Sequence, residues 1–351
     1  MNDTTTMKTA LPLLPSLALA LGSLALVACQ ADDTPPEEQA TLAVKTIVTD
    51  ELGNLHAAAV ALQGAAPDPD DDGWDATADA DAVGRMRTHW AEARVSYERI
   101  EGAIAVLFPD LDAATDERYD GFLEAAPDSD LFDGDGVTGV HAIERILWAD
   151  AHPPETVAFE MALEGYQPAA YPADATQAAA FKDELVQRLV DDVAAMQESF
   201  EPLALDPAAA YSGVVSSMAE QLEKVDLAAT GEDESRYADH TLADMRANLE
   251  GGRELYDAFV PWLTGEPGGE ALHEQVMAGF ERVEAGYADH SGNGVPPVPE
   301  GWSAEPSDEL RATPYGQLFD MLEHEADPAA DDSLVRAMID AADLMEIPVT
   351  P

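Results

Sequence analysis

Apolar residues recur at the three- and four-residue spacing of an amphipathic helix along most of this chain. Runs in which Val, Ile, Thr and Tyr alternate with polar residues over the length of a strand are nearly absent, so no sheet is predicted. The chain is therefore predicted to be all-α. Helices are expected over residues 41–63, 82–108, 139–148, 176–200, 208–229, 240–263, 269–290 and 331–345.

Segments rich in proline and glycine separate these helices, at 64–73, 151–175 and 291–314. An apolar fraction of 46% is enough for a substantial core. The predicted organisation is one all-α domain over 41–351, made of two packed bundles at about 41–165 and 176–351. The number of helices would allow a duplicated bundle, although no sequence repeat is evident.

The first 28 residues have the features of a bacterial lipoprotein signal peptide. Lys8 precedes an apolar run, and the run ends in the sequence LVAC at Cys29. Cleavage before Cys29 and lipidation of its thiol would anchor an exported protein to a membrane. A transmembrane helix is the alternative, and the alanine-rich end of the run argues against it. Gln30 favours the outer over the inner membrane, and residues 29–40 are expected to form a flexible tether.

Cysteine and charge further limit the chemistry. Cys29 is the only cysteine in the sequence, so an internal disulfide and a thiolate metal site are excluded. The chain carries 70 acidic and 17 basic residues, a formal net charge of −53. Such a surface repels nucleic acid and anionic lipid, and it favours cations or a basic partner. Solubility in a salty medium is the alternative explanation.

Two pairs of polar residues suggest a metal site. His141 and Glu144 are three residues apart in a predicted helix and so share one face. This spacing alone is common on solvated helices. Glu98 and Glu101 repeat it on the preceding long helix, where ion pairs with Arg94 or Arg99 are the alternative role.

An Asp-rich segment follows the second pair and contributes Asp110, Asp112, Asp116 and Asp120. Facing carboxylates and an imidazole in a helix bundle are typical of non-haem iron and manganese sites. Oxygen and imidazole ligands suit Fe, Mn or Zn better than soft copper.

Three stretches carry a resemblance to a known family: ARVSYERIE at 93–101, FPDLDAATDERYD at 108–120 and GVHAIERILW at 139–148. Together they resemble the imelysin-like family, especially its EfeO-type members of bacterial iron uptake. Gly139, His141 and Glu144 match the family motif G-x-H-x-x-E. The resemblance extends over about 41–263 and includes ELVQRLVDDVAAMQESF and ATGEDESRYADHTLADMRANLEGG.

This resemblance implies two four-helix bundles in an exported, periplasmic protein that captures iron, as Fe2+ or Fe3+, and delivers it without turnover. An iron permease or a peroxidase would be its partner, and Zn or Mn are the other candidate metals. Asp239 stands where EfeO-type chains often have a second histidine, and His240 is displaced by one position. Residues 30–40 are too few for the cupredoxin domain of some relatives. The implied metal ligands are His141, Glu144, Glu101 and Asp116, with Glu98 and Asp120 as second choices.

Two other functions stay open. The family has also been classed as metallopeptidases, but Ala142 and Arg145 break the H-E-x-x-H and H-x-x-E-H signatures of zinc peptidases. A metal-free interaction or scaffold lipoprotein of the same fold is the third interpretation. The acidic segment 68–79 has some spacings of an EF-hand loop, but it lacks the final glutamate and is better explained as a linker.

Overall fold

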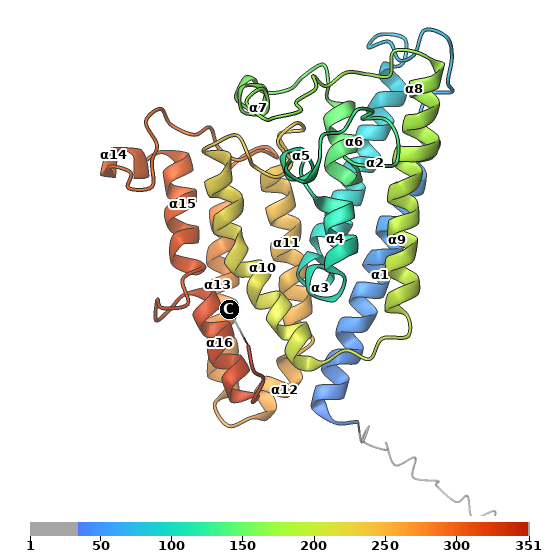
Figure 1. Cartoon of the computed structure of the whole chain (residues 1–351). Helices are drawn as coiled ribbons and strands as arrows, with labels where there is room; N and C mark the ends of the chain where they lie inside the picture. The colour runs from blue at the N-terminus through green and yellow to red at the C-terminus, as the bar shows by residue number, and fades with distance from the viewer. Residues whose placement is uncertain (1–33, 350–351) are drawn as a thin grey trace, which may run out of the picture. The chain divides into compact units, whose positions relative to one another are not determined.

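The computed structural model describes residues 34–349 and consists of helices joined by loops (Figure 1). No strand occurs within this range, so the predicted all-α class is confirmed. The helices are α1 (Pro36–Ala65), α2 (Ala80–Glu98), α3 (Glu101–Leu107), α4 (Pro109–Asp116), α5 (Tyr119–Ala125), α6 (Gly139–Leu147), α7 (Pro154–Glu160), α8 (Ala175–Ala180), the π-helical turn η1 (Phe181–Leu185), α9 (Val186–Phe200), α10 (Pro207–Ala228), α11 (Thr241–Asp257), α12 (Val260–Gly265), α13 (Gly269–Ala288), α14 (Asp308–Arg311), α15 (Pro314–Glu325) and α16 (Leu334–Leu344).

The long N-terminal helices form the first group. α1 packs along α2 and also along α9, while α4 and α6 contact α9 from another side. By these contacts α9 belongs with the N-terminal helices, whereas the sequence predicts that residues 176–351 form the second bundle. The boundary between the helix groups therefore falls in the loop after α9, because the apolar face of α9 is buried against α1.

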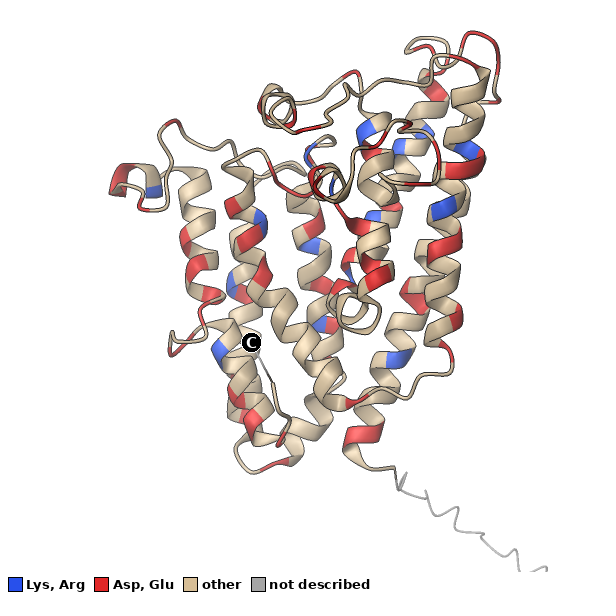
Figure 2. Cartoon of the chain, viewed as in Figure 1, with Lys and Arg blue, Asp and Glu red and all other residues tan. Residues whose placement is uncertain are grey.

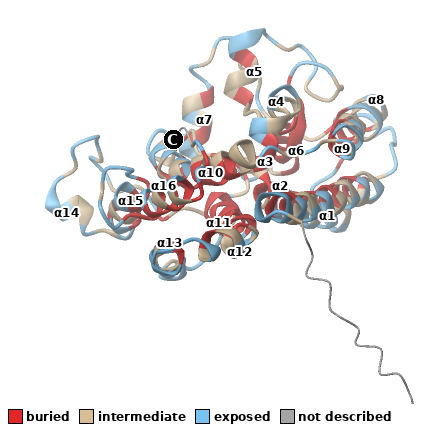
Figure 3. Cartoon of the chain, turned by 90° about the horizontal axis from the view of Figure 1, so that it is seen from below, coloured by how far each residue is buried: buried red, intermediate tan, exposed pale blue. Residues whose placement is uncertain are grey.

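The C-terminal helices form the second group, in which α10 packs against α11, α15 and α16, and α13 packs against α15 and α16. Buried residues lie on the helix faces that point toward neighbouring helices (Figure 3). The two groups meet where α3 contacts α10 and where α2 contacts α11. Polar side chains from both groups come together at this junction, which makes it the location of the candidate site.

A single helix is predicted over 82–108, but the structure breaks it after Glu98. Arg99 and Ile100 lie outside helix, and α3 begins at Glu101. The break accommodates close approaches of other helices: a Cβ on Gly251 of α11 would lie 2.1 Å from the carbonyl oxygen of Arg99. A Cβ on Gly102 of α3 would likewise lie 2.6 Å from the backbone of α10. Periodicity along one segment contains no information about these neighbours.

The ends of the predicted segments differ in smaller ways. α1 begins at Pro36, so the last residues of the predicted 29–40 tether are helical. α15 is not predicted, because Pro314 and Gly316 in its first turn are residues typical of a loop between helices. The signal peptide and Cys29 lie outside the described residues. Within 34–349 we find no helix with the length and apolarity needed to cross a bilayer.

Candidate metal centre

The helix α6 is short, and every one of its residues is buried. Gly139 begins it with φ of +82°, in the left-handed region, and a Cβ there would lie 2.4 Å from the carbonyl oxygen of Thr115. The Nε1 of Trp90 on α2 donates a hydrogen bond of 2.9 Å to the Val140 carbonyl. These two contacts fix α6 against the end of α4 and against α2, and they place His141 between the two helices.

Gly139→Ala is expected to lower the free energy of unfolding by about 2 kcal/mol or more, because a left-handed alanine is strained and its Cβ collides with α4. Urea unfolding followed by circular dichroism measures this loss. The control is Gly84→Ala at an exposed position of α2, where a Cβ meets nothing within 4 Å. There alanine should stabilise by up to about 1 kcal/mol. Equal stability of the two variants would contradict this account of the family glycine.

Glu144 holds the imidazole of His141 in place. Its Oε2 lies 2.8 Å from His141 Nδ1, and its Oε1 accepts hydrogen bonds from the backbone N–H groups of Tyr237 and Ala238. With both oxygens engaged in these contacts, Glu144 is placed to orient the imidazole, and it belongs to neither group of ligand atoms close enough to hold one metal ion. This arrangement leaves Nε2 as the ring nitrogen available for a ligand.

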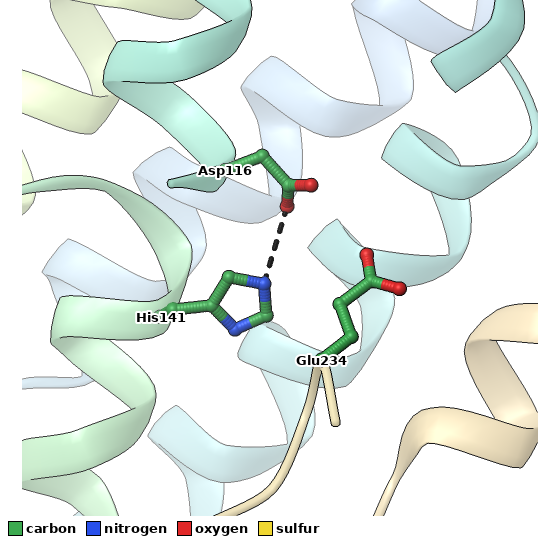
Figure 4. A group of neighbouring side chains, drawn as sticks. All are labelled: Asp116, His141 and Glu234. Carbon is green, nitrogen blue, oxygen red and sulfur yellow. Dashed lines mark ion pairs between the residues drawn. The ribbon is translucent and has the colours of Figure 1, made fainter. Parts of the chain in front are cut away.

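The other nitrogen of His141 makes no hydrogen bond to any residue in the described range, although the side chain is only 1% exposed. It lies 3.4 Å from Oδ1 of Asp116, the last residue of α4 (Figure 4). A buried polar atom without a hydrogen bond is uncommon in native proteins and calls for a ligand or a water molecule.

Glu234 completes this site from the loop between α10 and α11. One ligand atom each from Asp116, His141 and Glu234 lie within 4.8 Å of one another, and all three side chains converge in Figure 4. We call these three residues the His141 cluster. Glu234 is not predicted from the sequence, because it lies in a loop 90 residues from the histidine motif and has no spacing relation to it. Its place in the segment GEDESRY, within the stretch that resembles imelysins, is the available signal.

A second group overlaps the first. Glu98, Glu101, Asp116 and Glu234 offer carboxylate oxygens within 4.8 Å of one another, and we call them the four-carboxylate cluster. Glu98 and Glu101 therefore lie beside the His141 cluster but not in it. Two basic side chains already compensate these carboxylates, Arg94 from α2 and Lys224 from α10.

Arg94 is the more deeply buried of these cations. Its guanidinium pairs with Glu98 and Asp116, with Glu234 at 2.7 Å, and with Asp244 of α11 at 3.5 Å. The pair with Glu98 is the i,i+4 ion pair that the sequence offers as an alternative role. The guanidinium also joins α2, α4, α11 and the loop of Glu234, so it stabilises the whole junction.

Burial and nearby charges shift the pKa values of Glu234 and Glu101 in opposite directions. Burial would raise the pKa of Glu234, but Lys224, Arg94 and His141 outweigh it and hold that pKa well below its usual value. Burial raises the pKa of Glu101 to about 8, despite the nearby Lys224 ammonium. The low pKa of Glu234 keeps it an anionic ligand at neutral pH.

His141 responds mainly to its carboxylate neighbours. Burial and the charge of Arg94 lower its pKa, but Asp116 and Glu144 outweigh them and raise it to about 9. In the metal-free state the imidazole therefore carries a proton at neutral pH, and a metal ion would have to displace that proton.

A pocket of about 310 Å³ opens beside these residues. Seven of its eleven lining residues are acidic, including Asp116 and Glu234 of the His141 cluster. Acidic side chains occur on helices throughout the described chain (Figure 2), but here they line a concave site. A hydrated cation could reach the His141 cluster through this pocket.

Comparison with known proteins supports the resemblance seen in the sequence. The sequence model of the imelysin family matches residues 49–341. The chain belongs to the imelysin family. A solved imelysin-like protein from Psychrobacter arcticum has a similar structure, with a TM-score of 0.56 that covers 91% of this chain and 99% of that one. Its sequence is 12% identical, so this likeness shows the imelysin fold alone.

Two relatives have a stated role. The iron uptake system component EfeO of Escherichia coli is 28% identical over 202 residues, and so is its counterpart from Shigella flexneri. The matched region covers 58% of this chain and 44% of each relative. The match thus spans less than half the length of these two relatives.

The remaining predicted site residues lie elsewhere. Asp120, a second-choice ligand in the sequence-based set, pairs with Arg236 at 2.7 Å and is in neither cluster. His240 lies 3.1 Å from Asp244, stacks edge-on against Trp90 and is also outside both clusters. Among the described residues, the acidic segment 68–79 contributes to no group of ligand atoms close enough together to hold a metal ion.

Proposed function

We propose that this imelysin captures iron outside the cytoplasm and passes it on without chemical turnover. The observation that carries the proposal is the buried Nε2 of His141, which makes no hydrogen bond to the protein and faces Asp116 and Glu234. One imidazole and two carboxylates form a three-ligand site, and the adjoining pocket supplies room for water or a chelate at the remaining positions.

The donor set fits iron. Carboxylate and imidazole ligands suit Fe2+, Fe3+ and Mn2+, and they also accept Zn2+. The names of the Escherichia coli and Shigella flexneri relatives as iron uptake components favour iron among these. Asp116, His141 and Glu234 would be the direct ligands, and Glu144 would orient the imidazole. Compared with the sequence-based set, Glu234 takes the place of Glu101 and Glu144 moves to a supporting role.

Capture and delivery imply a location and a partner. Lipidation at Cys29 would hold the protein on the outer face of a membrane, with the outer membrane favoured over the inner. An iron permease or a peroxidase would receive the ion. Globomycin-sensitive processing of the precursor, and its loss in Cys29→Ala, would test the anchor.

The geometry does not favour a peptidase. Glu144, the glutamate of the histidine motif, is poorly placed to activate water as a zinc hydrolase requires, because both of its oxygens are engaged in hydrogen bonds. Cleavage of a broad peptide library that disappears in Glu144→Gln would restore the peptidase hypothesis.

The decisive experiment is metal titration of the purified mature protein. Isothermal titration with Fe2+ under anaerobic conditions, and with Mn2+ and Zn2+, should give one tight site per chain, with the bound metal verified by elemental analysis. A protein that binds none of these ions above background would overturn the proposal and leave the metal-free scaffold as the better explanation.

Binding should weaken as the pH falls. The pKa of His141 is about 9, so at pH 6–8 each bound ion must displace one proton from the imidazole. The Mn2+ affinity is therefore expected to rise about tenfold per pH unit over this range. Titrations in two buffers of different ionisation enthalpy measure the released proton. An Mn2+ affinity that does not change between pH 6 and 8 would contradict the assignment of His141 as a ligand.

A further inference from the structure

Lys224 occupies the position that a second cation would take in the four-carboxylate cluster. Its Nζ lies 3.1 Å from Glu98, 3.0 Å from Glu101 and 2.7 Å from Glu234. Three of the four carboxylates that could hold a metal ion therefore already surround an ammonium. Of the three carboxylates that contact Lys224, Glu234 also belongs to the His141 cluster, and it makes the shortest contact.

Lys224 can leave this position, whereas Arg94 cannot. Arg94 is fully buried and pairs with four carboxylates from different segments. Lys224 has 9% of its side chain exposed, lines the acidic pocket and has a flexible four-carbon stem. The ammonium can turn toward the pocket without movement of its helix.

A receiving carboxylate stands in the pocket. Glu220 lies one helical turn before Lys224 on α10 and lines the same pocket. Burial raises the pKa of Glu220, and the charge of Lys224 opposes that rise, so the two groups already interact. Glu220 can pair with the ammonium once it leaves the cluster.

We propose that Lys224 is a tethered counter-ion that an incoming metal ion displaces. In the metal-free protein its ammonium, together with Arg94, compensates the charge of the four-carboxylate cluster. When a metal ion binds the His141 cluster, the two cations repel each other across Glu234, and the ammonium moves into the pocket to pair with Glu220. This inference rests on the proposed function and deepens it: the tethered cation limits affinity, so that a captured ion can be released to the next carrier.

The test is a double-mutant cycle read by Mn2+ titration at fixed pH. Lys224→Met keeps the length of the side chain and removes its charge, and it should bind Mn2+ about tenfold more tightly than wild type. Glu220→Gln removes the receiving carboxylate and should weaken binding about threefold in the wild-type background but not in Lys224→Met. Equal or weaker binding by Lys224→Met would overturn the inference.

Glu223→Gln is the matched control. It lines the same pocket and changes the charge by the same amount, but it directly precedes Lys224, and adjacent residues of a helix do not face each other as residues one turn apart do. Glu223→Gln should change the Mn2+ affinity equally in the wild-type and Lys224→Met backgrounds. If Glu220→Gln also changes it equally in both backgrounds, the inference is overturned. If Lys224→Met does not fold, as judged by circular dichroism, Lys224→Gln replaces it in the cycle.

The outcomes separate this inference from the proposed function. Failure of every variant, wild type included, to bind metal overturns the proposed function and the inference with it. Tight binding by wild type without any gain in the Lys224 variant overturns the inference alone. Binding by the Lys224 variant and none by wild type supports the tethered cation and overturns the iron-capture proposal.

Discussion

Replacement of His141 by alanine is expected to lower the affinity for Mn2+ or Fe2+ by more than about a hundredfold. The loss of a supporting partner alone costs a metal site about 10- to 100-fold, and His141 is proposed as a direct ligand. Its Nε2 is the buried atom that faces Asp116 and Glu234 and makes no hydrogen bond to the described protein. Isothermal titration at pH 7.5 measures the loss, and elemental analysis of the purified variant checks it.

The chain offers a matched control in His89→Ala. His89 and Glu92 have the same H-x-x-E spacing, and their Nδ1–carboxylate distance is also 2.8 Å. The glutamate of this pair is 58% exposed, whereas Glu144 is fully buried. His89→Ala should bind metal like wild type. Loss of binding in both variants, or in neither, would refute the site.

Glu234 gives an independent check, because it is a proposed ligand that the structure identifies and the sequence does not. Glu234→Gln keeps the shape of the side chain and removes the anionic oxygen. If Asp116, His141 and Glu234 bind one ion, this variant should lose affinity to a degree similar to His141→Ala. Wild-type affinity in Glu234→Gln would show that the cluster does not act as one site.

Arg94→Leu is expected to lower the free energy of unfolding by about 3–5 kcal/mol, which is typical when one partner of a buried ionic network is removed. The variant would leave the carboxylates of Glu98, Asp116, Glu234 and Asp244 facing one another with too little compensating charge. Because Arg94 connects both helix groups, its loss should also separate them. Urea denaturation monitored by circular dichroism measures the effect.

Arg336→Leu controls for the removal of an i,i+4 ion pair as such. Arg336 pairs with Asp340 at 2.7 Å and has the same i,i+4 spacing as Arg94 and Glu98. Both partners of this pair are substantially exposed. Exposed helix pairs contribute only about 0.3–0.5 kcal/mol, so this variant should unfold almost as wild type does. A loss for Arg94→Leu as small as that for Arg336→Leu would contradict the structural role of the network.

Much of the fold is predictable because each long helix buries one face. The segments 41–63 and 176–200 show the periodic apolar residues that α1 and α9 bury against each other. The break after Glu98 is not predictable in this way, since it depends on Gly251 and α11 approaching the backbone of Arg99. Local periodicity predicts helices, and distant neighbours decide where they bend.

The same distinction applies to the site. Asp116 and His141 are predicted as ligands, and the structure brings them together with Glu234. Glu101 has no basic residue four positions further along the sequence, yet Lys224 reaches it from α10. An ion pair that spans more than a hundred residues leaves no local pattern in the chain.

By itself, the sequence determined the all-α class, the resemblance to imelysins and the histidine motif around which the candidate site forms. On its predicted helices it contains H-x-x-E twice, at His89 and at His141, and the local spacing does not distinguish them. Only the tertiary structure decided between them. In the folded chain α6 is buried, and Glu144 accepts hydrogen bonds from two backbone N–H groups. One imidazole nitrogen of His141 is left facing carboxylates from distant segments. The physical reason is desolvation: a buried imidazole nitrogen without a hydrogen bond calls for a ligand or an ordered water molecule, whereas an exposed one is satisfied by bulk water.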